Sequence, residues 1–292
     1  MKFDQLERLR IPLLELALGP CRDFDRWLFS FKATKLLLGR SIRRGNSSAL
    51  MWAEMISSND LYTGKDYAAA NPTWHDEDGG VKAANIAKIV RANKISCQKI
   101  VDTGCGTGGV LNALLQHDIF RDSVATGYDI APYAINLAKQ RERKNLRFHC
   151  GDFLQTNENY DLLLCIDVFE HIDDYMGFLR RLRGRSKYYA FHIPLDISIV
   201  GLLRGQHLKQ RKEVGHLHYF DQATALATLR DTGFKIIDAQ YTRTEDILLI
   251  HPEWRTTTAI LGNAARRIVR TIAGEDLSVR LLGGASLMVL TS

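Results

Sequence analysis

A glycine-rich segment between a predicted strand and a predicted helix constrains the fold of this chain more than any other feature. The strand covers residues 99–101 and ends at Asp102. Three glycines follow at alternate positions: Gly104, Gly106 and Gly108. Glycine allows a sharp turn and lets the backbone approach a ligand that a Cβ would obstruct. From Val110 the apolar residues have helical spacing, so the turn ends at a helix N-terminus suited to an anion. The same pattern also fits a purely structural turn.

Three further predicted strands end in acidic residues. Residues 124–128 lead to Asp129, which is placed about one βαβ unit later to accept hydrogen bonds from ribose hydroxyls. Residues 146–150 lead to Asp152 and Phe153, a carboxylate and an aromatic ring that suit an adenine amino group and an adenine face. The strand at 160–166 ends at Asp167. Each acid can instead be an ordinary residue at the end of a strand.

The motifs VDTGCGTGGVL, GYDIAPYAI, GDF and YDLLLCIDVFEHIDD follow one another in this order. Together they resemble the successive motifs of class I S-adenosylmethionine (SAM)-dependent methyltransferases, especially the branch that contains ubiquinone- and menaquinone-biosynthesis enzymes. The resemblance spans about residues 98–194 and continues more loosely to 241. It implies a Rossmann-like α/β fold with helices on both faces of a seven-stranded, mostly parallel sheet. Residues 234–241 and 286–291 would form its closing antiparallel hairpin.

The resemblance implies SAM as the cofactor and S-adenosyl-L-homocysteine as the product. Asp102 would organise the glycine turn, and Asp129 would hold the ribose. An aromatic side chain upstream could close over the sulfonium as a lid through cation–π attraction, although Trp74 also suits ordinary packing. The full predicted cofactor set is Tyr67, Trp74, Asp102, Gly104, Gly106, Gly108, Asp129, Ile130, Asp152, Phe153 and Asp167.

Several histidines fall where the loops after parallel strands meet, which is where open α/β sheets bind ligands. A neutral histidine accepts a proton from a hydroxyl near pH 7. We therefore expect the catalytic base among His192, His216 and His218. Glu170 and His171 are the weak metal candidates, because E-H with a distant histidine resembles the metal set of small-RNA 3′-terminal ribose methyltransferases. The same pair also occurs in metal-free relatives, and we expect no metal.

We expect two parts: residues 1–90 as an N-terminal helical cap and lid, and residues 91–292 as the SAM-binding core. The core carries insertions at 195–220 and 244–283. Residues 26–44 form a basic amphipathic segment, which suits a cap helix on the core or peripheral contact with an anionic membrane.

Composition narrows the class further. The sequence contains no run of about 18 apolar residues, which is the length that a membrane span needs. The five cysteines form no C-x-x-C pair, which favours a reduced, cytoplasmic protein. The net charge of +6 favours an anionic partner. No RNA-binding module is visible, which argues against a nucleic-acid substrate.

We therefore expect a methyltransferase acting on an oxygen of a small or medium-sized molecule. The alternatives are an RNA ribose methyltransferase with or without a metal, a membrane-associated lipid or quinone methyltransferase, and a SAM-binding protein without turnover. The sequence leaves the substrate and the oligomeric state open.

Overall fold

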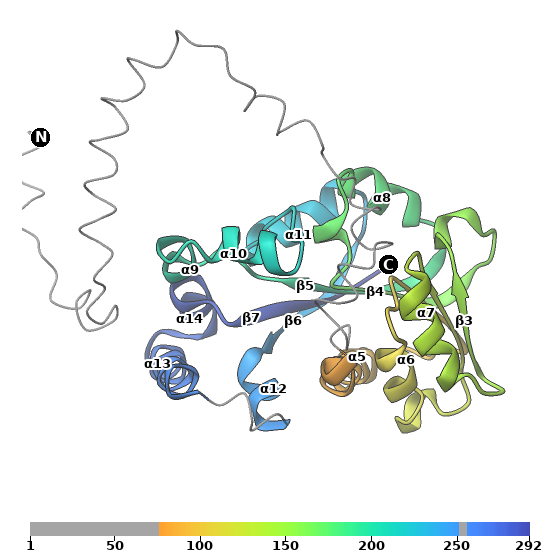
Figure 1. Ribbon diagram of the computed structural model, residues 1–292, viewed down its shortest axis with the longest axis horizontal. Helices are drawn as coiled ribbons and strands as arrows, with labels where there is room; N and C mark the ends of the chain where they lie inside the picture. The colour runs from red at the N-terminus through yellow and green to blue at the C-terminus, as the bar shows by residue number, and fades with distance from the viewer. Residues whose placement is uncertain (1–75, 251–255) are drawn as a thin grey trace, which may run out of the picture. The chain divides into compact units, whose positions relative to one another are not determined.

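A seven-stranded sheet organises the computed structural model, which describes residues 76–250 and 256–292. Its strands are β1 (Lys99–Thr103), β2 (Val124–Asp129), β3 (Leu146–Cys150), β4 (Tyr160–Ile166), β5 (Ser186–Pro194), β6 (Ile236–Arg243) and β7 (Ala285–Thr291). They lie in the order β3-β2-β1-β4-β5-β7-β6 (Figure 1). Strands β1 to β5 pair in parallel, and β7 runs antiparallel to both β5 and β6. The predicted Rossmann-like fold and its closing hairpin are confirmed.

Helices cover both faces of this sheet. They are α5 (Gly79–Ala92), α6 (Gly109–Leu114), α7 (Pro132–Ala138), α8 (Tyr175–Leu182), α9 (Ile199–Leu203), α10 (Gln206–Glu213), α11 (Gln222–Asp231), α12 (Thr244–Ile250), α13 (Thr257–Ala273) and α14 (Glu275–Leu282). In Figure 1, α5 and α6 lie on one face and α8 and α11 on the other. None of these helices is long and apolar enough to cross a membrane.

The sheet separates two hydrophobic cores because side chains alternate between its faces. Ile100, Leu162 and Leu164 face the core beneath α5 and α6, whereas Val101 and Leu163 face the core beneath α8 and α11. A strand that is buried on both faces needs a continuous apolar run, which explains the sequence of β4. The parallel arrangement also brings the carboxyl ends of β1, β2, β4 and β5 to one edge.

The first described helix is fixed tightly to the core. A Cβ at Gly79 would lie 2.8 Å from the backbone carbon of Gly109, so α5 and α6 approach each other at a glycine. Residues 1–75, with the predicted cap, the 26–44 segment, Tyr67 and Trp74, lie outside the described residues. The division of the chain at residue 90 therefore stays a prediction.

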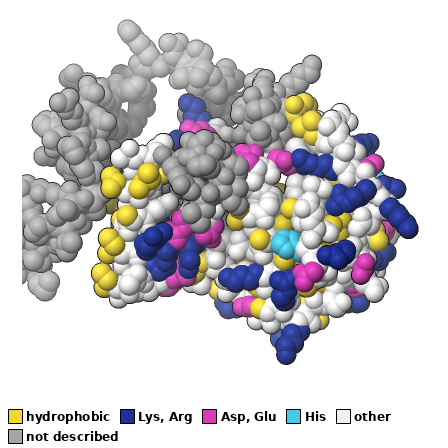
Figure 2. All heavy atoms as spheres, turned by 90° about the horizontal axis from the view of Figure 1, so that it is seen from below, with side chains coloured by type: hydrophobic (Ala, Val, Ile, Leu, Met, Phe, Trp, Pro, Cys, Tyr) yellow, Lys and Arg dark blue, Asp and Glu magenta, His cyan; other side chains and the backbone are white. Residues whose placement is uncertain are grey.

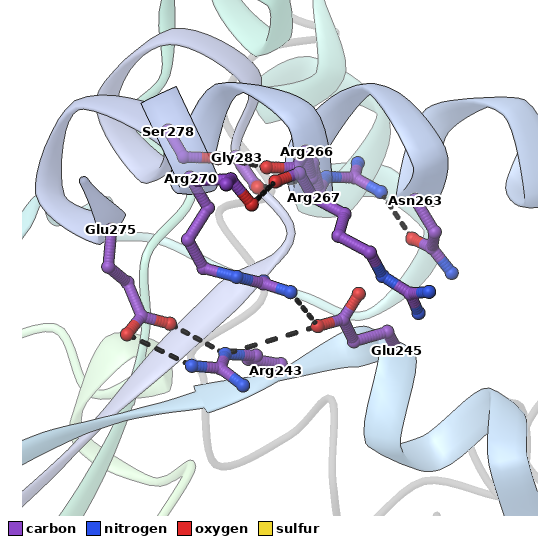
Figure 3. A network of polar contacts seen from close by, with 10 residues as sticks. Arg243, Glu245, Asn263, Arg266, Arg267, Arg270, Glu275, Ser278 and Gly283 are labelled. Atoms are coloured by element: carbon purple, nitrogen blue, oxygen red, sulfur yellow. Dashed lines mark hydrogen bonds and ion pairs between the residues drawn. The ribbon is translucent and has the colours of Figure 1, made fainter. Parts of the chain in front are cut away.

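Both predicted insertions are helical. The first contains α9 and α10, and the second contains α12, α13 and α14. An ion pair fixes the second insertion to the end of β6, because Arg243 pairs with Glu275 at 2.6 Å (Figure 3). A second ion pair lies within the insertion and joins Arg270 of α13 to Glu245 of α12 at 2.7 Å. Figure 2 shows hydrophobic side chains gathered at the end of the molecule where α13 lies. The exposed ones on α13 are Ile260, Leu261, Ile268 and Ile272.

Candidate active site

A cavity of about 730 Å³ lies at the carboxyl ends of the parallel strands. This volume is within the range of small-molecule binding sites. The predicted residues that line it are Asp102, Gly104, Gly106, Asp129, Ile130, Asp152, Phe153, Asp167, His171, His192 and His216. The ends of five parallel strands, β1 to β5, therefore meet at one cavity. Gly108 and His218 do not line it, and Glu170 lies buried behind it.

The glycines of the turn differ in their surroundings: Gly108 packs against a neighbouring ring, whereas Gly106 borders open space. All three glycines have positive φ, 75° at Gly104, 53° at Gly106 and 80° at Gly108. A Cβ at Gly108 would lie 2.3 Å from the ring of Phe148, whereas a Cβ at Gly106 would have no heavy atom within 4 Å. Gly108 thus precedes α6 and packs against β3, and its part in binding the cofactor stays a prediction. Gly106 faces the cavity.

Asp129 holds the glycine turn as well as lining the cavity. Its Oδ2 accepts a hydrogen bond from the backbone N–H of Gly106 at 2.8 Å, and its Oδ1 accepts one from Ala131 at 2.8 Å. Burial raises the pKa of Asp129, although these backbone donors oppose the shift. The ends of β1 and β2 are therefore joined through one carboxyl group, a structural role that the sequence did not reveal.

The predicted adenine pair is arranged for packing and capping. The Asp152 carboxylate accepts a hydrogen bond from the backbone N–H of Leu154 at 2.9 Å. Phe153 is only 1% exposed, and the Arg185 guanidinium carbon lies 5.0 Å from its ring centroid. Both residues line the cavity, but Phe153 offers only a small part of its surface to it.

Asp102 is a buried acid with an unpaired oxygen. It is 1% exposed, and its Oδ1 has no hydrogen-bond partner among the residues that the structure describes. Burial, together with the nearby charge of Asp129, raises the pKa of Asp102 well above its ordinary value. A buried carboxyl group without a partner is costly, so a ligand that donates a hydrogen bond here would be favoured.

Asp167 is the centre of a charged network at the end of β4. Its Oδ1 lies 2.5 Å from Nδ1 of His192, and its Oδ2 lies 2.9 Å from Nζ of Lys82. Burial acts to raise the pKa of Asp167, but its contacts with His192 and Lys82 outweigh burial and lower the pKa. Nε2 of His192 lies 2.7 Å from Oγ1 of Thr242. Strand β4 pairs with β5 so that Ile166 lies opposite His192, and Asp167 directly follows Ile166. This register brings the side chains of Asp167 and His192 together.

Sequence reasoning missed Lys82. This residue lines the cavity from α5, and its side chain is 15% exposed. Burial acts to lower the pKa of Lys82, but Asp167 outweighs this effect and raises it. A signal was present, because Lys82 precedes the buried Ile86 by four residues and so shares its face of the helix. A lysine on the apolar face of a helix indicates a buried acidic partner.

A second network, which sequence reasoning also missed, holds the glycine turn and lies partly in the cavity wall. Arg141 donates two hydrogen bonds to the Asp76 carboxylate, at 2.5 and 2.7 Å, and one to the backbone oxygen of Thr107 at 2.7 Å. The hydroxyl of Thr107 donates to Asp76 at 2.7 Å. Bidentate pairs of this kind have a fixed geometry, so the network orients the turn. Nothing in the local sequence pairs Asp76 with Arg141.

The two histidines at 216 and 218 differ in their surroundings. Nδ1 of His216 lies 2.6 Å from the Asp196 carboxylate, and this ring lines the cavity. The prediction that His218 faces the same site is corrected. Its Nε2 lies 2.9 Å from the backbone oxygen of Ile172, and its ring packs 4.4 Å from that of Tyr175.

The fold and the cavity define a Rossmann-like α/β protein with a ligand site at the carboxyl edge of its sheet. The family model described as "Methyltransferase domain" matches residues 73–239, more than half of the chain. The chain therefore belongs to the methyltransferase-domain family, and the resemblance inferred from its motifs is confirmed.

Curated relatives match the central part of the chain. A ubiquinone biosynthesis O-methyltransferase of Coxiella burnetii is 26% identical over 113 residues, which are 35% of this chain and 47% of the relative. A malonyl-[acyl-carrier protein] O-methyltransferase of Bacillus anthracis is 34% identical over 108 residues, 36% of this chain and 35% of the relative. The match thus spans about half or less of these relatives.

Solved structures show the same fold over a longer stretch. The magnesium protoporphyrin IX methyltransferase of Synechocystis PCC 6803, crystallised with bound SAH, has a TM-score of 0.52 at 14% identity. The alignment covers 80% of this chain and 96% of that one. The putative methyltransferase complexed with the Haloferax volcanii Trm112 activator also has a TM-score of 0.52, at 16% identity, with the same coverage.

Proposed function

We propose that this protein is a SAM-dependent methyltransferase that transfers a methyl group to an oxygen of a small or medium-sized acceptor. The observation that carries the proposal is the meeting of the glycine turn, Asp129, Asp152 and Asp167 at one cavity of about 730 Å³. Membership of the methyltransferase-domain family supports the reaction class. The names of two curated relatives, both O-methyltransferases, support oxygen as the acceptor atom.

Several cavity residues fit the polar groups of SAM. Gly106 leaves open space where a Cβ would stand, so the cofactor can approach the backbone there. Asp129 retains lone pairs for ribose hydroxyls beyond its two backbone donors, since an ionised carboxylate accepts about four hydrogen bonds. The unpaired oxygen of Asp102 suits an ammonium donor. SAM itself supplies an electrophilic methyl group, so the protein has mainly to align the acceptor and take its proton.

His192 is the proton acceptor that we propose. The ionised Asp167 accepts the Nδ1–H of this ring, which assigns the lone pair to Nε2 and stabilises the imidazolium once a proton is bound. The Thr242 hydroxyl now donates a hydrogen bond to Nε2. An acceptor hydroxyl must therefore replace the Thr242 hydroxyl as the donor to Nε2. Lys82 keeps Asp167 ionised and so fixes this tautomer.

Calorimetry with S-adenosylhomocysteine tests the cofactor part of the proposal. The wild-type chain should bind in the micromolar range, roughly −7 to −8 kcal/mol. Asp129→Asn should weaken binding by about 1.5–3 kcal/mol through lost charge-assisted hydrogen bonds. Asp161→Asn is the matched control, because this acid accepts hydrogen bonds from the backbone N–H groups of Gln98 and Lys99 at the start of β1 and does not line the cavity. Absence of binding by the wild-type chain would refute the proposal.

Turnover and affinity together test the role of His192. His192→Asn should reduce turnover on an identified acceptor by about 10²–10⁴-fold while leaving S-adenosylhomocysteine affinity nearly unchanged. Thr242→Val, which removes the competing hydroxyl, should retain turnover. Near-normal turnover of His192→Asn would show that the proton leaves by another route.

A further inference from the structure

A cluster at the wall of the cavity combines one carboxyl group and two imidazoles. The ligand atoms that Glu170, His171 and His216 can offer lie within 4.8 Å of one another. The ring centroids of the two histidines are 4.8 Å apart, and His171 Nε2 lies 3.9 Å from Glu170 Oε1. The backbone joins the two segments, since the N–H groups of Leu217 and His218 donate to the carbonyl of Glu170 at 2.8 and 3.1 Å.

The carboxyl group of this cluster accepts no hydrogen bond from the part of the chain that the structure describes. Glu170 is fully buried, and among the described residues neither of its oxygens takes part in a hydrogen bond. Buried polar side chains nearly always have a partner, because an unpaired one costs several kcal/mol in apolar surroundings. Both oxygens of Glu170 are therefore available to a cation.

Each histidine is held by a polar contact at Nδ1, and Nε2 of His171 lies 3.9 Å from Oε1 of Glu170. Nδ1 of His171 lies 3.2 Å from the backbone oxygen of Gly215. Nδ1 of His216 lies 2.6 Å from Asp196, whose other oxygen accepts a hydrogen bond from Gln210 at 2.6 Å. Histidines that bind a metal through one nitrogen usually donate the other N–H to a carbonyl or carboxylate in this way.

We propose that Glu170, His171 and His216 form a binding site for a divalent first-row transition metal, with Zn²⁺ as the best-suited ion. Two imidazole nitrogens and one carboxylate are ligands that zinc and iron sites use, whereas Mg²⁺ and Ca²⁺ prefer oxygen ligands. Ligand atoms about 2.0–2.2 Å from one ion lie about 3–3.5 Å apart. Side-chain movements of about 1 Å would bring the ligand atoms from separations of up to 4.8 Å to these distances.

Asp167, three residues before Glu170, does not belong to this site. Asp167 pairs with His192 and Lys82, so it is already engaged and the cluster has three protein ligands. His171 and His216 both line the cavity. The remaining coordination positions of the ion would therefore face the cavity contents, where an oxygen ligand can bind. From the sequence we expected no metal. This proposal goes beyond methyl transfer, and the binding of the ion does not depend on the proposed methyltransferase activity.

Zinc titration of the untagged, chelator-treated full chain tests the site in the absence of SAM. Wild-type protein should bind one Zn²⁺ per chain with micromolar or tighter affinity and should bind Mg²⁺ at least 100-fold more weakly. Glu170→Gln and His216→Gln should each weaken Zn²⁺ binding by at least 100-fold. Asp196→Asn, which alters the carboxylate that holds His216 and Gln210 but no proposed metal ligand, should weaken Zn²⁺ binding by about 10–100-fold.

Two controls separate this site from other zinc ligands. His117→Gln should leave Zn²⁺ affinity unchanged, because His117 precedes β2 at the opposite edge of the sheet. Cys150→Ser should also leave it unchanged, which excludes the exposed thiol. If Glu170→Gln does not fold, the His216 and Asp196 variants decide the outcome. Undetectable zinc binding by the wild type, unchanged binding in these variants, or equal affinity for Mg²⁺ would each overturn the proposal.

Discussion

Replacing Gly108 by alanine should destabilise the fold much more than the same change at Gly106. Both residues have positive φ, which costs an alanine about 1–2 kcal/mol. At Gly108 the new Cβ would lie 2.3 Å from the ring of Phe148, which is only 2% exposed. Overpacking of this kind adds about 1–3 kcal/mol. We therefore expect Gly108→Ala to lose about 2–5 kcal/mol and Gly106→Ala about 1–2 kcal/mol.

Urea unfolding at pH 7 measures this difference. With an m-value of about 2 kcal/mol/M, the midpoints of the two variants should differ by about 0.5–1.5 M. A double-mutant cycle with Phe148→Leu identifies the ring as the cause. The smaller side chain should relieve the clash and give a favourable coupling of at least about 1 kcal/mol. Equal losses in the two alanine variants, or a coupling below about 0.5 kcal/mol, would refute the assignment.

Two further predictions concern charged groups. Lys82→Met removes the cation 2.9 Å from the buried Asp167 and should lower the free energy of unfolding by about 3–5 kcal/mol. The double variant with Asp167→Asn should lose less stability than the sum of the two single variants. Additive losses in urea unfolding would contradict the pairing. Hydrogen bonds from Lys187 and two backbone N–H groups lower the pKa of Asp161 to about 2. Its contribution is therefore fully present above the unfolded pKa of about 4 and is lost as pH falls toward 2, so the stability of Asp161→Asn should change less over that interval.

The fold class, and the edge of the sheet at which the cavity lies, could be predicted from the sequence because both depend on local sequence patterns. An apolar run such as 160–166 specifies a strand buried on both faces. Glycines at alternate positions indicate a turn whose backbone needs positive φ. Parallel strands of one sheet end at the same edge, so the acidic residues near their carboxyl ends lie close together. Asp102, Asp129, Asp152 and Asp167 were found because each lies within two residues of the end of a strand.

Only the tertiary structure decided which side chains meet across long distances in sequence. Lys82 reaches Asp167 from α5, and Arg141 reaches Asp76 from the far side of the glycine turn. The distinction between Gly106 and Gly108 depends on Phe148 of β3, and that between His216 and His218 depends on the carbonyl of Ile172. Local sequence sets backbone conformation, whereas side-chain partners depend on packing between elements that are distant in the chain.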